Sequence, residues 1–240
     1  MTDSASRPTP ARQVLLLDLS VDPDLYRPTE HWQSLLGDVP WRRVHLSAGE
    51  TTLPSPASFT HLIVTGSEAS ILEEQDWYAP AEDLVRQAVA AHRPVLGSCF
   101  GHQLIVRALL GPEHLRRSRH PELGWFPVET IADAAPVSTA GRRIWMFCCH
   151  LDEVFDLPPG WQVLARTPDC AVHAYRLADQ PVWGVQAHPE ITPTQGAALL
   201  RGFADKRSDL RPAVERALAA PARDDGFGRE LIAHFLETEA

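Results

Sequence analysis

Residues 94–103, PVLGSCFGHQ, constrain the fold of this chain more than any other stretch. The stretch begins with a short apolar run and ends where a helix-forming run starts. The helix-forming run continues to Gly111, which is followed by proline, a usual helix ending. Between them, residues 97–101 have the G-x-S-x-G pattern of a nucleophile elbow, with cysteine in place of serine. A strand that turns directly into a helix crowds the residues beside the turn, so glycine is needed there. The sequence therefore predicts a strand, a sharp turn and a helix, with Cys99 at the turn.

Cys99 has the surroundings of a nucleophile in this arrangement. A side chain at the turn points outward, and the partial positive charge of the helix N-terminus favours thiolate over thiol. The backbone N–H of Phe100, at the helix start, is free to bind a developing oxyanion. A single cysteine after a strand is more often a small buried hydrophobic residue, and this alternative stays open without a base and an acid.

The composition excludes several classes of function. The 240 residues fit one compact α/β domain better than two small ones. A net charge of −9, with no basic run, argues against a nucleic-acid partner. No apolar run approaches the ~20 residues of a membrane span, and the polar first residues do not have the pattern of a signal peptide. The four cysteines fit a reduced, cytoplasmic compartment, and their spacing is not that of a metal site, so we expect no metal. No P-loop is present, and we expect no cofactor.

The first half of the chain alternates strands with helices. Strands are predicted at residues 13–19, 43–46, 61–67 and 95–96, and helices at residues 28–36, 77–91 and 102–110. This alternation is typical of a parallel sheet with helices on both faces. Ligands of such sheets bind beyond the carboxyl ends of the strands, where the Gly66 and Cys99 turns both lie.

After Gly111 the pattern changes to short strands joined by turns. Strands are predicted at residues 124–129, 143–147, 162–166, 172–176 and 182–186, with helices at residues 195–203, 213–219 and 229–236. Short spacing and turn residues indicate antiparallel pairing of these strands. The predicted fold class is α/β and three-layered, with a central, mostly parallel sheet flanked by helices and a small antiparallel extension. We expect a disordered tail at residues 1–11, one domain over residues 12–204, and a C-terminal helical extension, residues 205–240, packed on it.

A candidate base and acid follow the last predicted strand, at His188 and Glu190. A cysteine nucleophile needs a base to deprotonate it and a third group to orient that base. On an extended backbone, residues two apart project to the same side, and Pro189 restricts the backbone between them. Taken alone, the segment is more often a histidine and a glutamate on a solvated loop.

These motifs together resemble the class I, triad-type glutamine amidotransferases, particularly stand-alone members similar to the glutaminase domain of GMP synthase. The resemblance covers roughly residues 62–192 and is carried by five segments: residues 65–67, 94–103, 124–125, 150–154 and 184–190. The chain order agrees, because His188 precedes Glu190, whereas in α/β-hydrolases the acid precedes the histidine. The resemblance implies a flavodoxin-like class I glutamine amidotransferase fold.

The resemblance also implies roles for individual residues. Cys99 would be the nucleophile, His188 the base and Glu190 its orienting acid. The implied substrate-binding groups are the oxyanion-hole N–H groups of Gly66 and Phe100, the Gln103 side chain, and the backbone of Leu151 and Asp152. The chain departs from the family at Ala187, where a bulkier aromatic is usual, and at Leu151, where a small residue is usual, and both changes affect the shape of the pocket.

The implied reaction is hydrolysis of a γ-glutamyl amide through a Cys99 thioester. The preferred substrate is glutamine, with the ammonia passed to a separate synthase. The alternative is a stand-alone hydrolase of γ-glutamyl peptides or conjugates. A non-catalytic regulatory role is a third reading, disfavoured by the intact Cys99, His188 and Glu190. A basic cluster at residues 116–120 is interpreted as a solvated loop, and His102 as a structural residue rather than the base.

Overall fold

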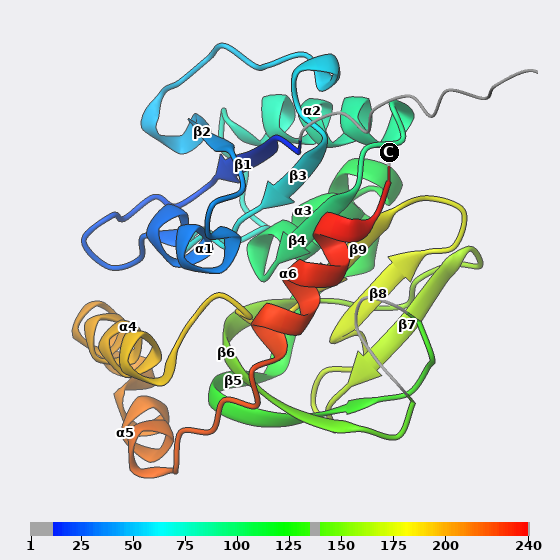
Figure 1. Ribbon diagram of the computed structural model, residues 1–240. Coiled ribbons are helices and arrows are strands. Elements are labelled where there is room, and N and C mark those ends of the chain that lie inside the picture. The colour runs from blue at the N-terminus through cyan, green and yellow to red at the C-terminus, as the bar shows by residue number, and fades with distance from the viewer. Residues whose placement is uncertain (1–11, 135–139, 240) are drawn as a thin grey trace, which may run out of the picture.

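The computed structural model describes residues 12–134 and 140–239, so the predicted tail at residues 1–11 lies outside the described residues. A nine-stranded sheet runs through the described part, in the order β2-β1-β3-β4-β9-β8-β7-β5-β6 (Figure 1). The strands are β1 (Val14–Asp18), β2 (Trp41–His45), β3 (His61–Val64), β4 (Val95–Ser98), β5 (Leu115–Thr130), β6 (Arg143–Val154), β7 (Trp161–Arg166), β8 (Ala174–Leu177) and β9 (Val182–Val185). The α-helices are α1 (Pro28–Leu36), α2 (Tyr78–Ala90), α3 (Phe100–Leu110), α4 (Pro193–Lys206), α5 (Arg211–Ala219) and α6 (Phe227–Glu237).

The parallel half of the sheet comprises β2, β1, β3, β4 and β9. Every residue of β1, β3, β4 and β9 is buried, as expected for strands covered on both faces. Leu15 and Leu17 pack in one core with residues of α2 and α3, whereas Val14 and Leu16 pack in a second core with residues of α1 and α6. This alternation confirms the predicted three-layer α/β class.

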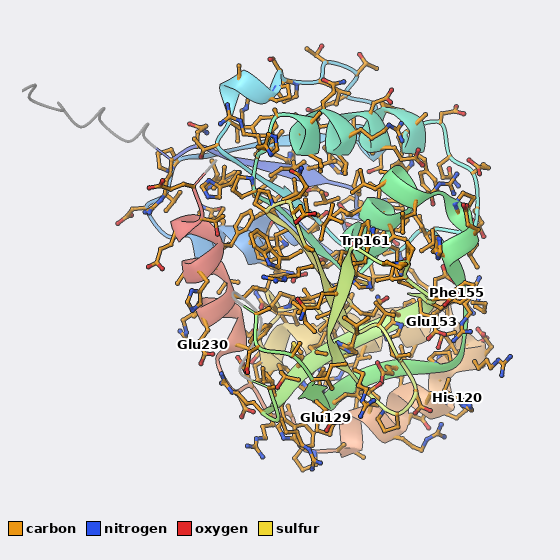
Figure 2. The ribbon with its side chains drawn as sticks, turned by 90° about the vertical axis from the view of Figure 1, so that its right-hand side faces the viewer. His120, Glu129, Glu153, Phe155, Trp161 and Glu230 are labelled. Carbon is orange, nitrogen blue, oxygen red and sulfur yellow. The ribbon has the colours of Figure 1, made fainter. Side chains whose placement is uncertain are left out.

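The antiparallel half comprises β8, β7, β5 and β6, so the sheet is mixed and its antiparallel part is larger than the small extension predicted. The two long strands of this half extend further than predicted. The basic cluster predicted as a solvated loop lies on β5 instead. Arg116 pairs with Glu153 at 2.6 Å, and its guanidinium lies 4.7 Å from the ring centroid of Phe155. Both partners, Glu153 and Phe155, lie at the carboxyl end of β6 (Figure 2). Arg117 pairs with Asp152 at 2.9 Å. The loop interpretation was wrong because each arginine faces a carboxylate directly across the strand pair, which stabilises a sheet.

Strand β9 joins the two halves of the sheet. It pairs antiparallel with β8, as predicted, but also parallel with β4, where Leu96 lies opposite Trp183 and Ser98 opposite Val185. The carboxyl ends of β4 and β9 therefore meet at one edge of the sheet. This pairing places the segment after β9 beside the turn that holds Cys99.

The last helix packs against both the sheet and the segment after β9. Phe227, Leu231 and Phe235 of α6 are buried in the core that contains α1. At Gly228, a Cβ would overlap the carbonyl oxygen of Pro189, so the first turn of α6 lies directly on the backbone between His188 and Glu190. In the described residues, no helix has the length and apolarity needed to cross a membrane.

The two glycines of the turn are required by close backbone contacts. A Cβ at Gly97 would lie 2.5 Å from the carbonyl group of Gly101, and a Cβ at Gly101 would overlap the carbonyl oxygen of Val64. Helix α3 therefore starts in backbone contact with β3. This is the crowding that the G-x-S-x-G pattern predicts at a strand-to-helix turn.

Gly101→Ala should lower the free energy of unfolding by at least about 1–3 kcal/mol, because β3 and α3 must separate to accept the methyl group. Urea denaturation followed by circular dichroism measures the change. Gly202→Ala in α4 is the matched control: its Cβ would meet only the flexible end of the Leu25 side chain, so alanine there should be neutral or mildly stabilising. Equal stability of the two variants would contradict the close approach of α3 to β3.

Candidate active site

The structure brings together the residues predicted as nucleophile, base and acid. Cys99 directly follows β4, and His188 and Glu190 follow the neighbouring parallel strand β9. A backbone hydrogen bond of 2.9 Å from Cys99 N to Val185 O ties the two segments together. All three side chains belong to buried residues, at 3–5% exposure. The site therefore lies at the carboxyl edge of the parallel half of the sheet.

The backbone of Cys99 is strained. Its φ of 49° and ψ of −106° lie in a region that residues with a Cβ rarely adopt. Such strain costs of order 1–3 kcal/mol and is found at functional sites, where the surrounding structure holds it in place. The thiol makes a long contact of 3.8 Å with the carbonyl oxygen of Cys149. Phe100 is the first residue of α3, so its N–H has no acceptor within the helix.

His188 and Glu190 form a buried ion pair, with 2.8 Å between Nδ1 and Oε1. Because Nδ1 faces a carboxylate, we assign its proton there, which leaves Nε2 for Cys99. Burial alone would lower the pKa of His188, but the charges of Cys99 and Glu190 and hydrogen bonds to both outweigh it and raise the pKa to about 10. Burial would raise the pKa of Glu190, but His188 and Tyr26 hold it below its usual value. The pair is thus charged at neutral pH.

Tyr26 is a site residue that the sequence did not reveal. It lies in the loop between β1 and α1, and its hydroxyl donates to Glu190 Oε1 at 2.5 Å and lies 3.3 Å from His188 Nδ1. The Tyr26 and His188 rings meet edge to face, with centroids 5.4 Å apart. The one sequence feature that could have pointed to Tyr26 is its place in the loop after a predicted parallel strand, because ligand sites form at the carboxyl ends of such strands.

Gly66 lies directly against this cluster. A Cβ there would be 2.8 Å from His188 Cε1 and 3.1 Å from the Tyr26 hydroxyl oxygen, so the imidazole occupies the space that any larger residue would need. Gly66 follows β3 closely and Phe100 follows β4, so both lie at the same edge of the sheet as the candidate nucleophile. Their role as an oxyanion hole stays a prediction.

A pocket of about 190 Å³ opens beside Cys99. Its lining includes Phe100, Gln103, Leu151 and Asp152, which are four of the five residues predicted to bind substrate. The Gln103 amide nitrogen donates to Asp152 O at 2.8 Å and to Gln186 Oε1 at 3.1 Å, so the Gln103 carbonyl oxygen is the group left for a ligand. Leu151 and Asp152 lie within β6, which is longer than predicted and forms one wall of the pocket.

His102, the other histidine near Cys99 in sequence, is a core residue. It has no exposed surface, and its ring lies 4.6 Å from that of Tyr175 between centroids. Burial lowers the pKa of His102 to about 3. The prediction that it is structural agrees with this position.

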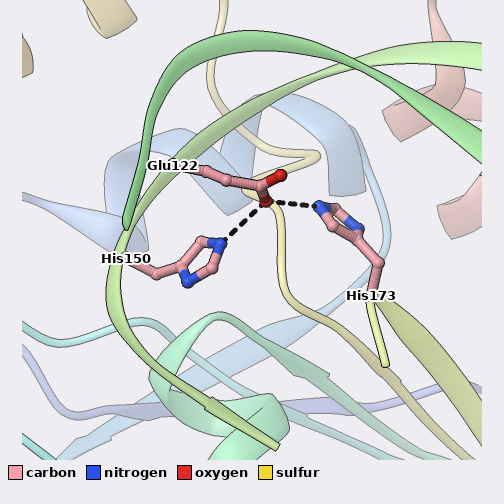
Figure 3. Close-up of side chains that lie close together, drawn as sticks. All are labelled: Glu122, His150 and His173. Atoms are coloured by element: carbon pink, nitrogen blue, oxygen red, sulfur yellow. Dashed lines mark hydrogen bonds and ion pairs between the residues drawn. The ribbon is translucent and has the colours of Figure 1, made fainter. Parts of the chain in front are cut away.

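A second buried cluster joins Glu122 of β5, His150 of β6 and His173, which directly precedes β8 (Figure 3). Glu122 Oε2 is 3.0 Å from His150 Nε2 and 3.5 Å from His173 Nε2, and its other oxygen accepts a 2.5 Å hydrogen bond from Thr167. Its donor atoms are of the kind that bind a metal, but these hydrogen bonds already account for the cluster. His150 Nδ1 also reaches Asp152 O at 3.1 Å, so the cluster supports the pocket wall.

Glu122→Gln should lower the free energy of unfolding at pH 7 by about 2–4 kcal/mol, because it removes the charged acceptor of a buried network. Burial alone would raise the pKa of Glu122, but the hydrogen bonds and charges of His150 and His173 hold it well below its usual value. Its stabilising effect is therefore complete above pH ~4.5 and is lost as the pH falls further. Urea denaturation at pH 7, 5 and 4 should show the gap between wild type and variant narrowing at the lowest pH. A constant gap would contradict the depressed pKa.

The chain is similar in sequence to glutamine amidotransferases and to GMP synthases. Residues 46–206 match the family model "Glutamine amidotransferase class-I". The chain is 33% identical over 147 residues to one subunit of the glutamine-hydrolyzing GMP synthase of Thermococcus kodakarensis, covering 61% of this chain and 70% of that protein. It is 38% identical over 112 residues to the corresponding protein of Pyrococcus furiosus, of which it spans 58%. Against the GMP synthase of Parafrankia sp., 32% identity extends over 80% of this chain but only 35% of the relative.

Solved structures share the fold. A glutamine amidotransferase from Thermotoga maritima superposes with a TM-score of 0.74 at 19% identity, over 95% of this chain and 99% of that one. A glutamine amidotransferase from Methylobacillus flagellatus gives a TM-score of 0.70 at 19% identity, over 95% and 94%. With the family model spanning most of the chain and the cysteine turn at the edge where β3, β4 and β9 end, the chain belongs to the class-I glutamine amidotransferase family.

Proposed function

We propose that this protein hydrolyses glutamine to glutamate and ammonia through a thioester on Cys99, and that the ammonia serves a separate synthase. The observation that carries the proposal is the position of Cys99, on a strained turn within hydrogen-bonding reach of the buried His188–Glu190 pair. A nucleophile, its base and an orienting acid in this order are the constellation of thiol acyl-transfer enzymes.

The first half of the reaction forms the thioester. The Cys99 sulfur attacks the γ-carbonyl carbon, and the carbonyl oxygen becomes an oxyanion that the N–H groups of Gly66 and Phe100 bind. The carbon–nitrogen bond then breaks as the His188 imidazolium gives its proton to the departing nitrogen, which leaves as ammonia. The raised pKa of His188 supports this step, because the imidazole holds a proton at neutral pH.

The second half releases glutamate. His188, now neutral, takes a proton from water, and the resulting hydroxide attacks the thioester carbon. The carbon–sulfur bond breaks, glutamate leaves, and the thiolate–imidazolium pair is restored. Glu190 stays ionised throughout and keeps Nδ1 of the imidazole in place through the 2.8 Å hydrogen bond.

The proposed partner follows from the relatives. Several are named as one subunit of a glutamine-hydrolyzing GMP synthase, and this chain spans about a third of a GMP synthase whose name gives no separate subunits. The proposal is tested by measuring glutamate release from glutamine by the purified chain, with and without cell extract. Stimulation by extract supports a synthase partner, and no glutamate release under either condition would refute the proposed activity.

A second candidate, hydrolysis of γ-glutamyl peptides or conjugates, is favoured by the extent of the pocket. The lining of the pocket includes Phe203 of α4 and Arg207 just after it, as well as Cys99, and this extent favours a leaving group larger than ammonia. Comparing kcat/KM for glutamine with kcat/KM for a panel of γ-glutamyl dipeptides separates the two. A dipeptide preferred over glutamine by tenfold or more, with no effect of extract, would favour the hydrolase.

A further inference from the structure

We propose that Tyr26 is a positioning residue of this site, which acts through Glu190 to orient His188. The proposal rests on the proposed function. Tyr26 reaches the site from the N-terminal end of the chain, 162 residues before His188. It is 2% exposed, and its hydroxyl donates to the same oxygen of Glu190 that accepts the hydrogen bond from the imidazole.

The hydrogen bonds around Glu190 define what Tyr26 contributes. Oε1 accepts from His188 Nδ1 at 2.8 Å and from the Tyr26 hydroxyl at 2.5 Å. Oε2 is buried and has no hydrogen-bond partner among the described residues. A buried carboxylate stays ionised only when donors compensate for lost hydration, so Tyr26 is one of two side chains that keep Glu190 charged.

The charge of Glu190 in turn sets the orientation of His188. An ionised Oε1 holds the proton on Nδ1, which directs Nε2 toward Cys99. The Tyr26 ring adds a steric limit, because it packs edge to face on the imidazole, and both lie against Gly66. Tyr26 does not itself line the pocket, and its hydroxyl contacts Glu190 and His188, so its effect on the reaction passes through these two residues.

The loop that carries Tyr26 is fixed in place. Thr65 Oγ1 accepts from Leu19 N at 3.0 Å, and Glu68 Oε2 accepts from Val21 N at 2.9 Å, so the loop is bound to the segment after β3. The backbone N–H of Tyr26 donates to Asp22 O at 2.9 Å. A hydroxyl held this firmly can orient its partner without losing side-chain freedom during the reaction.

The test is Tyr26→Phe, which keeps the ring and removes the hydroxyl. We expect kcat for glutamine to fall about 10- to 100-fold, as for loss of one hydrogen bond to a buried charge, with KM nearly unchanged. The pKa of Glu190 should rise, so the acid limb of the pH–rate profile should move to higher pH. The titratable groups that face this cluster are Glu190, His188, Cys99, Glu68 and His31.

Tyr175→Phe is the matched control. Tyr175 is also fully buried and also donates one hydrogen bond, of 2.6 Å, but its acceptor is the carbonyl oxygen of His102 in the core. Tyr175→Phe should lower the free energy of unfolding, measured in urea, by an amount comparable to that of Tyr26→Phe. It should keep the kcat and the pH profile of the wild type. Unfolding at low pH would affect both variants, so an acid limb displaced in Tyr26→Phe but not in Tyr175→Phe separates positioning from a merely structural role.

A double variant tests the route of the effect. If Tyr26 acts through Glu190, adding Tyr26→Phe to Glu190→Gln should change kcat by less than about threefold, because coupled residues are not additive. The proposal would be overturned if Tyr26→Phe kept the kcat and the acid limb of the wild type. It would also be overturned if Tyr26→Phe lowered kcat as much in the Glu190→Gln background as it does alone. Cys99→Ala in the same assay separates the two hypotheses: an active Cys99→Ala enzyme refutes the proposed function, whereas an inactive one beside a wild-type-like Tyr26→Phe refutes only the role of Tyr26.

Discussion

Cys99→Ser should release glutamate from glutamine at least ~10³-fold more slowly than the wild type, because a serine hydroxyl gives up its proton far less readily than a thiol. The substitution changes one atom and leaves the strained backbone in place, so KM should change little. The pKa of His188 should also fall from about 10, since Cys99 is the largest of the influences that raise it against burial. Steady-state kinetics and the NMR titration of the His188 ring check both outcomes.

Cys170→Ser serves as the control for this first prediction. Cys170 is buried and does not line the pocket beside Cys99, so its substitution should leave kcat unchanged. A Cys99→Ser enzyme that retains the wild-type rate would show that the thiol is not the nucleophile. The non-catalytic reading of the chain would then become the better one.

His188→Gln should lower kcat by about 10³- to 10⁴-fold, because it removes the group that protonates the departing nitrogen and then activates water. The wild-type pH profile should reflect the raised pKa: kcat/KM stays level from pH 7 to 9 and falls only as His188 loses its proton near pH 10. This basic limb should be absent from the residual activity of His188→Gln. A basic limb near pH 6.5 in the wild type would contradict a charged His188.

Two further variants make the second prediction specific. His234 is an exposed histidine on α6, and His234→Gln should be indistinguishable from the wild type. The kcat of the double variant, Cys99→Ser with His188→Gln, should lie within about tenfold of the kcat of the slower single variant. This is expected because the two residues act as one unit. Multiplicative losses would mean that they act independently.

Local sequence patterns predicted the elements that depend on local contacts. The turn at Cys99 is specified by its own glycines and by the helix ending at Gly111, and all of these lie within one stretch of fifteen residues. The strand β1 and the helices α1 and α2 lie close to their predicted bounds because their apolar spacing matches a sheet buried on both faces. The candidate base and acid, His188 and Glu190, could also be proposed from local sequence, because they lie two residues apart directly after a predicted strand.

Elements that depend on distant partners were predicted less well. Arg116 and Arg117 were assigned to a loop because their carboxylate partners lie more than thirty residues away, on β6. Tyr26 had no visible role because its acceptor, Glu190, is 164 residues distant. The contact of Gly228 with Pro189 likewise exists only once α6 folds back over the sheet.

The sequence alone determined which chemistry is present: a thiol at a glycine-flanked turn, and an imidazole and a carboxylate two residues apart after a strand. The tertiary structure alone decided that β9 lies beside β4, so that Cys99 meets His188, and that the loop after β1 brings Tyr26 to Glu190. The physical reason is that hydrogen bonds between strands use backbone groups that are alike in every residue. The choice of neighbouring strand is therefore made by the packing of the whole core and cannot be read from either strand alone.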